Sequence, residues 1–460
     1  MTDEDRLVGI FHAYDVRGVV PDEFDARIAW AIGFGFAKFA ATDAGAPTKV
    51  LVGRDMRTSG EALSAALLAG AFAAGATVVD LDLCSTDLCY FASGYLDAAA
   101  AMLTASHNPA RYNGVKFCLP GARPVGEESG LFMVRELALE ALALAPERAA
   151  APAGVEQVRL LDTFAEHVHS FVDLDALAPL SVVADTANGM GGLVAPRVFA
   201  GLPFHLEMLY GELDGNFPNH PADPIQPENL RDLQVLLLER HADVGLAFDG
   251  DADRVFVVDE TGSPLSGSTT TAIVARALLE KHPGATILYN VICSKTVREV
   301  IAESGGVGVR TRVGHSFIKS VMAETGALFG GEHSGHYYFA DNYRADSGII
   351  AALVVLETLS KAGGTLSELR RPFERYVVSG EINSTVHDAA GVIDSIRTSA
   401  REAGAEIDEL DGLTADYGSW WFNLRSSNTE PLLRLNVEAP DEATLRARTD
   451  ELLAVIRAGN

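Results

Sequence analysis

The sequence predicts an α/β protein with several domains and largely parallel sheets. The chain has 460 residues, which at ordinary domain sizes corresponds to about three or four domains. Apolar, strand-like segments alternate with helical patterns over most of the length, and this alternation is typical of βαβ units. The composition is 48% hydrophobic and 22% charged, which suffices for sizeable cores and excludes fibrous and wholly disordered proteins.

The expected elements follow one another in a regular order. Strands are expected at 49–55, 77–83, 115–119, 181–188, 204–210, 244–250, 254–260, 286–291 and 307–313, and helices at 59–75, 191–200, 227–240 and 269–280. One uncharged stretch, Ala62 to Val79, is long enough to be tested as a membrane span. It is mostly Ala and Gly, which gain little from lipid, so we expect a buried helix followed by a strand.

Three segments interrupt this alternation and suggest domain boundaries. Residues 142–156 are rich in Ala and Pro, and residues 367–376 are strongly charged and precede a tail of different texture. Residues 259–268 are rich in turn formers. We therefore expect domains over residues 1–150, 151–258, 259–368 and 369–460.

Charge and cysteine usage limit the partners and the compartment. The formal net charge of −27 disfavours a general attraction to nucleic acid or to an anionic membrane. The first residues carry early acids and no apolar segment, so no secretory signal is expected there. The four cysteines form no CxxC pair, and we expect buried, reduced thiols in a cytoplasmic protein. The sequence does not indicate the oligomeric state.

The first of four polar loops lies in Ala101–Lys116. An apolar strand delivers Ser106 into a polar turn, where a hydroxyl can carry a covalent group if it is activated. His107 is adjacent in sequence, which disfavours it as the partner base. Asn113–Gly114 suits a tight turn before the next strand. An ordinary hydrogen-bonded turn is the alternative interpretation of the segment.

The second loop contains three aspartates at alternate positions. Asp249, Asp251 and Asp253 would point one way in near-extended backbone, and three converging carboxylates favour a hard cation such as Mg²⁺. A calcium EF-hand is excluded, because Arg254 occupies the position of its required glycine and strands replace the flanking helices. A solvated acidic turn is the alternative.

The third loop, Gly330–His336, offers Glu332 and Ser334 as partners for sugar hydroxyls. The histidines of this region fit no standard zinc spacing, so a proton-transfer role or a hydrogen-bonded turn is expected instead. The fourth loop crowds phosphate-binding groups between two strands, with an ordinary polar hairpin as the alternative. Its candidate ligands are Arg425, Ser427, Asn428 and Thr429.

Together the four loops describe one chemistry. A covalent serine, a hard-metal site, a hydroxyl-binding loop and a phosphate-binding loop would serve phosphoryl transfer on a phosphorylated sugar, if they converge where strands end at a domain crevice. A metal-dependent sugar phosphatase would share the acids and the phosphate loop. A non-catalytic sugar-phosphate-binding protein would not need Ser106 or the three aspartates.

The motifs AYDVRG, TASHNP, DGDADR, GEHSGH and RSSNTEP occur here in order along nearly the whole chain. In this the sequence resembles the α-D-phosphohexomutase superfamily, in its phosphomannomutase/phosphoglucomutase branch. The resemblance implies three α/β domains and a smaller C-terminal α+β domain around a central cleft. It also implies an isomerase that interconverts hexose 6-phosphate and hexose 1-phosphate, of mannose first and glucose second, through a hexose 1,6-bisphosphate.

The resemblance further implies site residues and a cofactor. Ser106 would be the phosphoserine and would bind Mg²⁺ together with Asp249, Asp251 and Asp253. Arg17 and Lys116 would lie near the phosphoserine, and His315 would be a candidate for proton transfer. The implied substrate-binding residues are Tyr14, Arg254, Gly314, Glu332, Ser334, His336, Arg425, Ser427, Asn428 and Thr429.

Two positions depart from the pattern of this branch. Relatives often carry a lysine where Ile292 stands, and Lys295 is a candidate to supply the missing contact. His333 stands where methionine is common, which leaves the sugar preference open. The assignment of the general acid and base also stays open.

Overall fold

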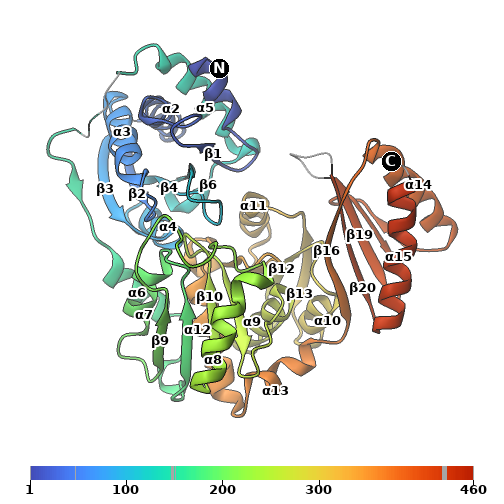
Figure 1. Cartoon of the computed structure of the whole chain (residues 1–460). Coiled ribbons are helices and arrows are strands. Elements are labelled where there is room, and N and C mark those ends of the chain that lie inside the picture. The colour runs from blue at the N-terminus through green and yellow to red at the C-terminus, as the bar shows by residue number, and fades with distance from the viewer. Residues whose placement is uncertain (1, 47, 147–149, 151, 427–431, 459–460) are drawn as a thin grey trace.

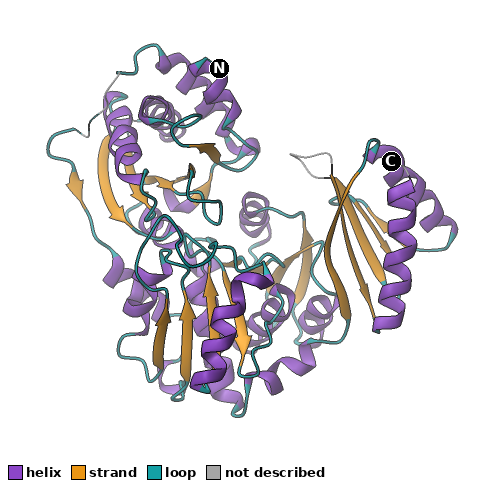
Figure 2. Ribbon diagram, in the orientation of Figure 1, coloured by secondary structure: helices purple, strands orange, loops and turns teal. Residues whose placement is uncertain are grey.

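The structure is a computed structural model that describes residues 2–46, 48–146, 150, 152–426 and 432–458. It contains four domains, each with its own sheet, that follow one another along an arc from the N-terminal domain to the C-terminal domain (Figure 1). Three sheets are mixed and the fourth is antiparallel, with helices packed against them (Figure 2). The predicted α/β fold class, with three α/β domains and an α+β domain at the C-terminus, is confirmed.

The sheet of the first domain has the order β1-β5-β4-β2-β3-β7, with β6 beside β5. Its centre is parallel, and β5 returns antiparallel to β4. Gly70 explains the Ala/Gly-rich helix, because a Cβ there would lie only 1.9 Å from the Trp30 carbonyl oxygen on the neighbouring helix. The elements are α1 (Asp3–Gly9), β1 (Val16–Val19), α2 (Ala26–Ala44), β2 (Lys49–Arg54), α3 (Gly60–Ala73), β3 (Thr77–Leu83), α4 (Thr86–Tyr95), β4 (Ala99–Leu103), β5 (Tyr112–Leu119), β6 (Arg123–Pro124), α5 (Leu131–Leu142) and β7 (Glu156–Gln157).

The second and third domains repeat one plan, in which parallel strands end in an antiparallel hairpin. The orders are β11-β10-β8-β9 and β13-β12-β14-β15. The second domain contains α6 (Leu161–His169), β8 (Ser181–Asp185), α7 (Gly191–Phe199), β9 (His205–Leu209), α8 (Arg231–Arg240), β10 (Val244–Phe248) and β11 (Val255–Asp259). The third contains α9 (Gly267–Lys281), β12 (Thr286–Asn290), α10 (Lys295–Glu303), β13 (Val307–Thr311), α11 (His315–Thr325), β14 (Phe329–Gly331), β15 (Tyr337–Phe339), α12 (Gly348–Ala362) and α13 (Leu366–Arg370).

The fourth domain is an antiparallel sheet of order β16-β20-β19-β18-β17 with a separate apolar core. Two helices lie on one face of this sheet (Figure 1). Its elements are β16 (Val377–Thr385), α14 (Ala389–Glu402), β17 (Glu406–Asp408), β18 (Leu413–Asp416), β19 (Trp421–Ser426), β20 (Leu432–Ala439) and α15 (Glu442–Ala458). Short 3₁₀ helices lie at Pro120–Ala122, Glu127–Ser129, Leu174–Ala176, Pro227–Leu230, Ala340–Asn342 and Arg371–Phe373.

All four polar loops connect antiparallel strands. They join β4 to β5, β10 to β11, β14 to β15, and β19 to β20. The first three domains therefore each present polar residues from the tip of one hairpin.

One turn prediction is wrong. Asn113 and Gly114 lie inside β5, opposite β1, and not in a turn before the strand. The glycine is needed for close approach, because a Cβ at Gly114 would lie 2.1 Å from the carbonyl oxygen of Val16. Asn113 is buried, and its side chain donates to the Ser59 hydroxyl.

Among the described residues, no single helix is long and apolar enough to cross a membrane. Only α12 together with the segment 366–373 passes such a test on length and composition, at a bend of 98°, and α12 is largely buried in the core. The stretch 62–79 divides into most of α3 and the start of β3, as expected. The four cysteines are buried and free.

Candidate active site

Ser106 lies just beyond the end of β4, in a turn with a left-handed backbone φ of 47°. Its N–H donates to the Thr104 hydroxyl at 2.9 Å, which holds the turn. The side chain is almost fully buried, and its Oγ donates to Oδ2 of Asp249 at 2.7 Å. The hydroxyl of the first domain therefore points directly at the acidic loop of the second.

Arg57 fixes the backbone of the loop that carries Ser106, a role that the sequence did not predict. Its guanidinium is fully buried and donates to the carbonyl oxygens of Ser106, Asn108, Pro109 and Tyr112 at 2.7–2.9 Å. Asp55 accepts from both its N–H and its Nε. The only sequence signal was a polar segment after the strand at 49–55.

The three aspartates converge as predicted, but for a different reason. Their carboxylate oxygens lie within 4.8 Å of one another, and all three side chains are buried. The backbone is not extended, because the loop turns through Ala252 with a φ of 61°. Oδ1 of Asp251 and Oδ1 of Asp253 are buried without a hydrogen-bond partner among the described residues. These carboxylate oxygens fit a hard cation such as Mg²⁺.

Two buried cations balance much of the acidic charge. Lys116 Nζ lies 2.8 Å from Asp251 Oδ2 and 2.6 Å from Asp253 Oδ2, and Arg254 Nε donates to Asp249 Oδ2 at 2.9 Å. Burial raises the pKa of Asp249 to about 7 despite Arg254. Burial opposes ionisation of Asp251 too, but Lys116 outweighs it and holds that pKa well below its usual value. The aspartates likewise overcome burial and raise the pKa of Lys116 well above normal.

His107 lies closer to Ser106 than its place in the sequence suggests. Its Nδ1 is 3.2 Å from the serine Oγ, while the Oγ donates to Asp249. Arg254 donates to the same Nδ1 at 2.6 Å. Burial, Arg254 and Arg17 lower the pKa of His107 well below its usual value. The ring is therefore neutral, and its available nitrogen is already engaged.

Arg17 and Tyr14 approach the site from the N-terminal segment. Arg17 pairs with Asp15 at 2.9 Å and donates to the Asn108 side chain in the serine loop. Tyr14 reaches the third domain, because a Cβ on Gly314 would lie 3.1 Å from its ring. Gly314 has a φ of 133°, which a residue with a side chain rarely adopts.

Glu332 is buried in the third-domain loop and held at both oxygens. Oε1 accepts from Asn290 Nδ2 at 3.2 Å and from the Gly314 N–H at 3.1 Å, and Oε2 accepts from the Tyr338 hydroxyl at 2.7 Å. Ser334 lies in the same loop and is half-buried.

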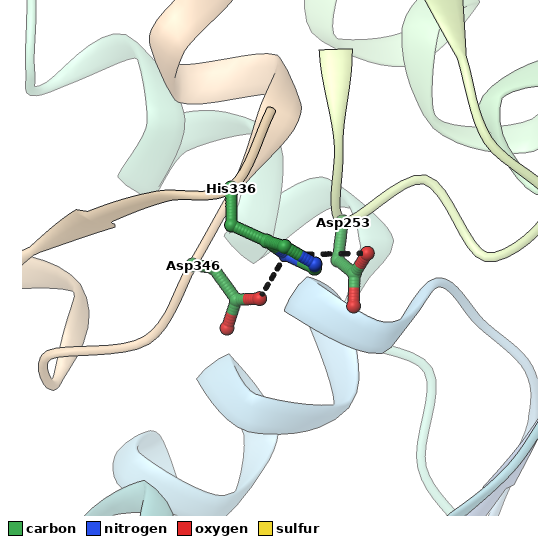
Figure 3. Close-up of side chains that lie close together, drawn as sticks. All are labelled: Asp253, His336 and Asp346. Carbon is green, nitrogen blue, oxygen red and sulfur yellow. Dashed lines mark hydrogen bonds and ion pairs between the residues drawn. The ribbon is translucent and has the colours of Figure 1, made fainter. Parts of the chain in front are cut away.

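His336 ends this loop beside the acidic cluster. Figure 3 shows its ring between Asp253 and Asp346, with Nδ1 at 3.8 and 2.9 Å from their oxygens. A backbone bridge also joins Arg254 to His336. The second and third loops are therefore directly connected.

The remaining predicted residues are placed less completely. His315 begins α11, but its side chain lies outside the described part of the structure, as do Ser427, Asn428 and Thr429. His333 interacts with the Ser268 hydroxyl at 3.0 Å, and burial lowers its pKa. Among the described residues, two groups have metal-binding geometry, and His336 is the histidine that belongs to one of them.

Lys295 and Arg425 both form ion pairs with acidic residues of the fourth domain. Lys295 Nζ lies 2.6 Å from Asp416 Oδ1 and 2.7 Å from the Gly418 carbonyl, so in this structure its charge is bound to the fourth domain. Arg425 lies within β19 and not in the following loop, where the sequence interpretation had placed it. Its Nη2 pairs with Glu381 Oε2 at 2.7 Å.

Comparison with known proteins gives consistent matches along the chain. Models of the phosphoglucomutase/phosphomannomutase family match as α/β/α domain I at residues 8–133, domain II at 162–262, domain III at 266–376 and the C-terminal domain at 381–455. The chain is 40% identical over 452 residues to a protein named phosphohexose mutases from Xanthomonas campestris, covering 97% of this chain and 99% of that one.

Two further relatives and one solved structure agree. A phosphomannomutase from Salmonella montevideo is 38% identical (97% of this chain, 99% of the relative). A phosphomannomutase/phosphoglucomutase from Pseudomonas putida is also 38% identical (96% and 94%). A crystal structure of a phosphoglucomutase/phosphomannomutase family protein from Burkholderia thailandensis superposes with a TM-score of 0.88 at 33% identity (100% and 98%). With its four matching domains and the loops of Ser106, the three aspartates and Glu332 joined as described, the chain belongs to the phosphoglucomutase/phosphomannomutase family of isomerases.

Proposed function

We propose that this enzyme interconverts the 6-phosphate and the 1-phosphate of a hexose, mannose in the first place and glucose in addition. The names of the Salmonella and Pseudomonas relatives support these two sugars. The proposed intermediate is the hexose 1,6-bisphosphate, which would also serve as an activator. Location in the cytoplasm and the domain limits given above remain predictions from the sequence.

The observation that carries this proposal is the contact between Ser106 and the aspartate cluster. A buried hydroxyl 2.7 Å from Asp249, beside Arg254 and Lys116, is placed to carry a phosphoryl group next to a cation site. Phosphoserine adds about −1.5 to −2 charges, so these cations and a bound metal are needed to balance it. A protein that only binds sugar phosphates would have no use for this arrangement.

In the first half-reaction, the free hydroxyl of the sugar phosphate attacks the phosphorus on Ser106. A new P–O bond to the sugar forms and the P–Oγ bond breaks. The sugar hydroxyl loses its proton, and the departing Ser106 Oγ takes up one, so that a serine hydroxyl is restored. The bisphosphate then reorients, and its other phosphoryl group is transferred back to Ser106. Lys116, Arg254 and Arg17 would stabilise the charge on the transferring group and hold it in line.

The metal and the sugar are assigned to separate groups. Asp249, Asp251, Asp253 and phosphorylated Ser106 would hold Mg²⁺, which when bound neutralises charge on the phosphoryl oxygens. The sugar would contact Tyr14, Gly314, Glu332, Ser334 and His336, with His315 as the candidate for proton transfer. The distal phosphate would bind Arg425, Ser427, Asn428 and Thr429.

The test is a panel of mannose, glucose and glucosamine 1-phosphates with Mg²⁺, in which the 6-phosphate product and free phosphate are both measured. We expect the 6-phosphate without stoichiometric release of phosphate, and intact-mass analysis should show one phosphate that is absent from Ser106→Ala. Free phosphate as the main product would indicate the phosphatase instead. Binding without any turnover would indicate the non-catalytic alternative.

A further inference from the structure

Lys319 is a buried lysine to which the proposed mechanism gives no role. It lies in α11 with a side chain that is 2% exposed, and its Nζ is 2.8 Å from Asp346 Oδ1. The ammonium also lies 3.7 Å from the centre of the Tyr90 ring and 5.9 Å from that of Tyr338. A lysine charge removed from water is tolerated only when it is paired. The position of this charge therefore requires an explanation.

One line of contacts leads from Lys319 to His336. Asp346 presents one carboxylate oxygen to the lysine and the other to Nδ1 of His336, at 2.9 Å (Figure 3). The Nδ1–H donates to Asp346, which fixes the plane of the ring. Nε2 has no hydrogen-bond partner within the described part of the chain.

A second line of contacts leads from Lys319 to Glu332. The Tyr338 ring lies against the same ammonium, and its hydroxyl donates to Glu332 Oε2 at 2.7 Å. The tyrosine and histidine rings also stack, with centres 6.2 Å apart. Glu332 and His336, at the two ends of the third-domain loop, are thus both connected to the buried ammonium of Lys319.

We propose that Lys319 is a positioning residue that acts through Asp346 and Tyr338 to orient His336 and Glu332 toward the hexose. The inference rests on the proposed function, since it assumes that these two side chains contact the sugar. Without the ammonium, the Asp346 carboxylate would lose the ion pair that holds it, and the His336 ring to which it is bonded would lose its fixed orientation. Asp253, His336 and Asp346 also have the geometry of a metal site, but the lysine already occupies Asp346.

The experiment compares Lys319→Met, Asp346→Asn and Tyr338→Phe with the parent chain. We expect kcat of the first two to fall about 10- to 100-fold, the range found when groups that orient active-site ligands are removed. KM, the phosphate content of Ser106 and Mn²⁺ affinity should stay near parent values. Lys319→Arg should restore part of the loss. Lys281→Met is the matched control, because it removes a lysine 2.9 Å from the buried Glu357 away from these loops.

A double-variant cycle separates positioning from general support of the fold. Asp346→Asn should cause no further loss of kcat in a His336→Ala background. An additive loss there, or parent-like kcat in folded Lys319→Met and Asp346→Asn, would overturn the proposal. If Lys319→Met does not fold, Asp346→Asn and Tyr338→Phe decide the question. A parent chain without mutase activity would overturn the proposed function and this inference together, whereas an active parent with unaffected variants overturns the inference alone.

Discussion

Ser106 and Asp249 come from different domains yet share one hydrogen bond, whereas Arg425 of the fourth domain pairs with Glu381 of its own sheet. Ser106 and Asp249 lie in loops between antiparallel strands, whereas Arg425 lies within strand β19. In the first three domains the tips are joined by buried contacts, including those of Lys116 and the bridge from Arg254 to His336. The difference shows that the loops of the first three domains are already joined into one prebuilt site, whereas Arg425 is held within the sheet of the fourth domain.

Substitution of one aspartate in the acidic loop of the prebuilt site should have the largest effect on activity. Asp251→Asn would leave Lys116 with one carboxylate partner and would take one charged oxygen from the cation site. We expect Mg²⁺ affinity and kcat to fall together by about 100-fold or more, as loss of a ligand exceeds loss of a supporting group. Mn²⁺ titration and the mutase assay measure this. Asp243→Asn, on the same domain at Ser181, is the control. Full activity in excess chelator would contradict the assignment.

The next largest loss of activity is expected from a change in the third-domain loop, Gly330–His336. Glu332→Gln disturbs a buried carboxylate that accepts three hydrogen bonds, and we expect a loss of about 1.5–3 kcal/mol, or roughly 10- to 150-fold in kcat/KM. Phosphorylation of Ser106 and metal affinity should remain. Glu357→Gln tests whether the loss of any buried carboxylate in this domain suffices. A metal-binding defect in Glu332→Gln would assign it to the other half of the site.

A smaller effect is expected in the fourth domain. Arg425→Ala should raise KM about 10-fold, because one charge-assisted contact to the distal phosphate is lost. It should also let the bisphosphate escape between the two half-reactions, which leaves Ser106 dephosphorylated. Activity across a titration with hexose 1,6-bisphosphate, with released bisphosphate measured, reports both changes.

Arg397→Ala on α14 of the same domain is the control for this variant. An unchanged KM together with no added leakage of bisphosphate would remove the fourth-domain loop from the mechanism.

The smallest effect is expected on the stability of the fold, from the ion pair between His220 and Asp185 in the second domain. His220 Nε2 lies 3.0 Å from Asp185, and although burial opposes its charge, this partner raises the pKa of His220 above its usual value. The pair therefore stabilises the fold fully below the unfolded pKa of about 6.5, and the contribution is lost as pH rises through the higher folded value.

We expect His220→Asn to lower the melting temperature at pH 5.5, by the equivalent of about 1 kcal/mol or less, and not at pH 9. Exposed His205 on β9, changed to Asn, is the control. Equal losses at both pH values would show that the ion pair is not the cause.

Much of the prebuilt site could be predicted because its residues follow apolar strands. Ser106 and the three aspartates stand directly after segments whose apolar pattern marks a strand, so their place at a sheet end follows locally. Arg57 could not be predicted, because its partners are backbone carbonyls about fifty residues later in the chain, as the sequence separations of 49 to 55 show. Lys319 was missed for a similar reason, since Asp346 and Tyr90 meet it only through the packing of separate elements.

The same limit explains the errors. Asn113–Gly114 matches a turn in local propensity, but β1 passes so close that only glycine fits at that point of β5. The aspartates were expected to align along an extended strand, whereas a left-handed Ala252 brings them together. In both cases the local pattern named the correct residues, and contacts distant in sequence decided the backbone.

The pair between Arg425 and Glu381 has a consequence for how tightly the enzyme can hold its substrate. In the role proposed for Arg425, a phosphate would compete with a carboxylate that lies 2.7 Å from Nη2. The net affinity would then be reduced by the loss of that charge-assisted contact. Such an exchange would keep the binding moderate and reversible, since the carboxylate can return when the phosphate leaves. Binding of this moderate strength would suit a bisphosphate intermediate that must reorient between the two half-reactions.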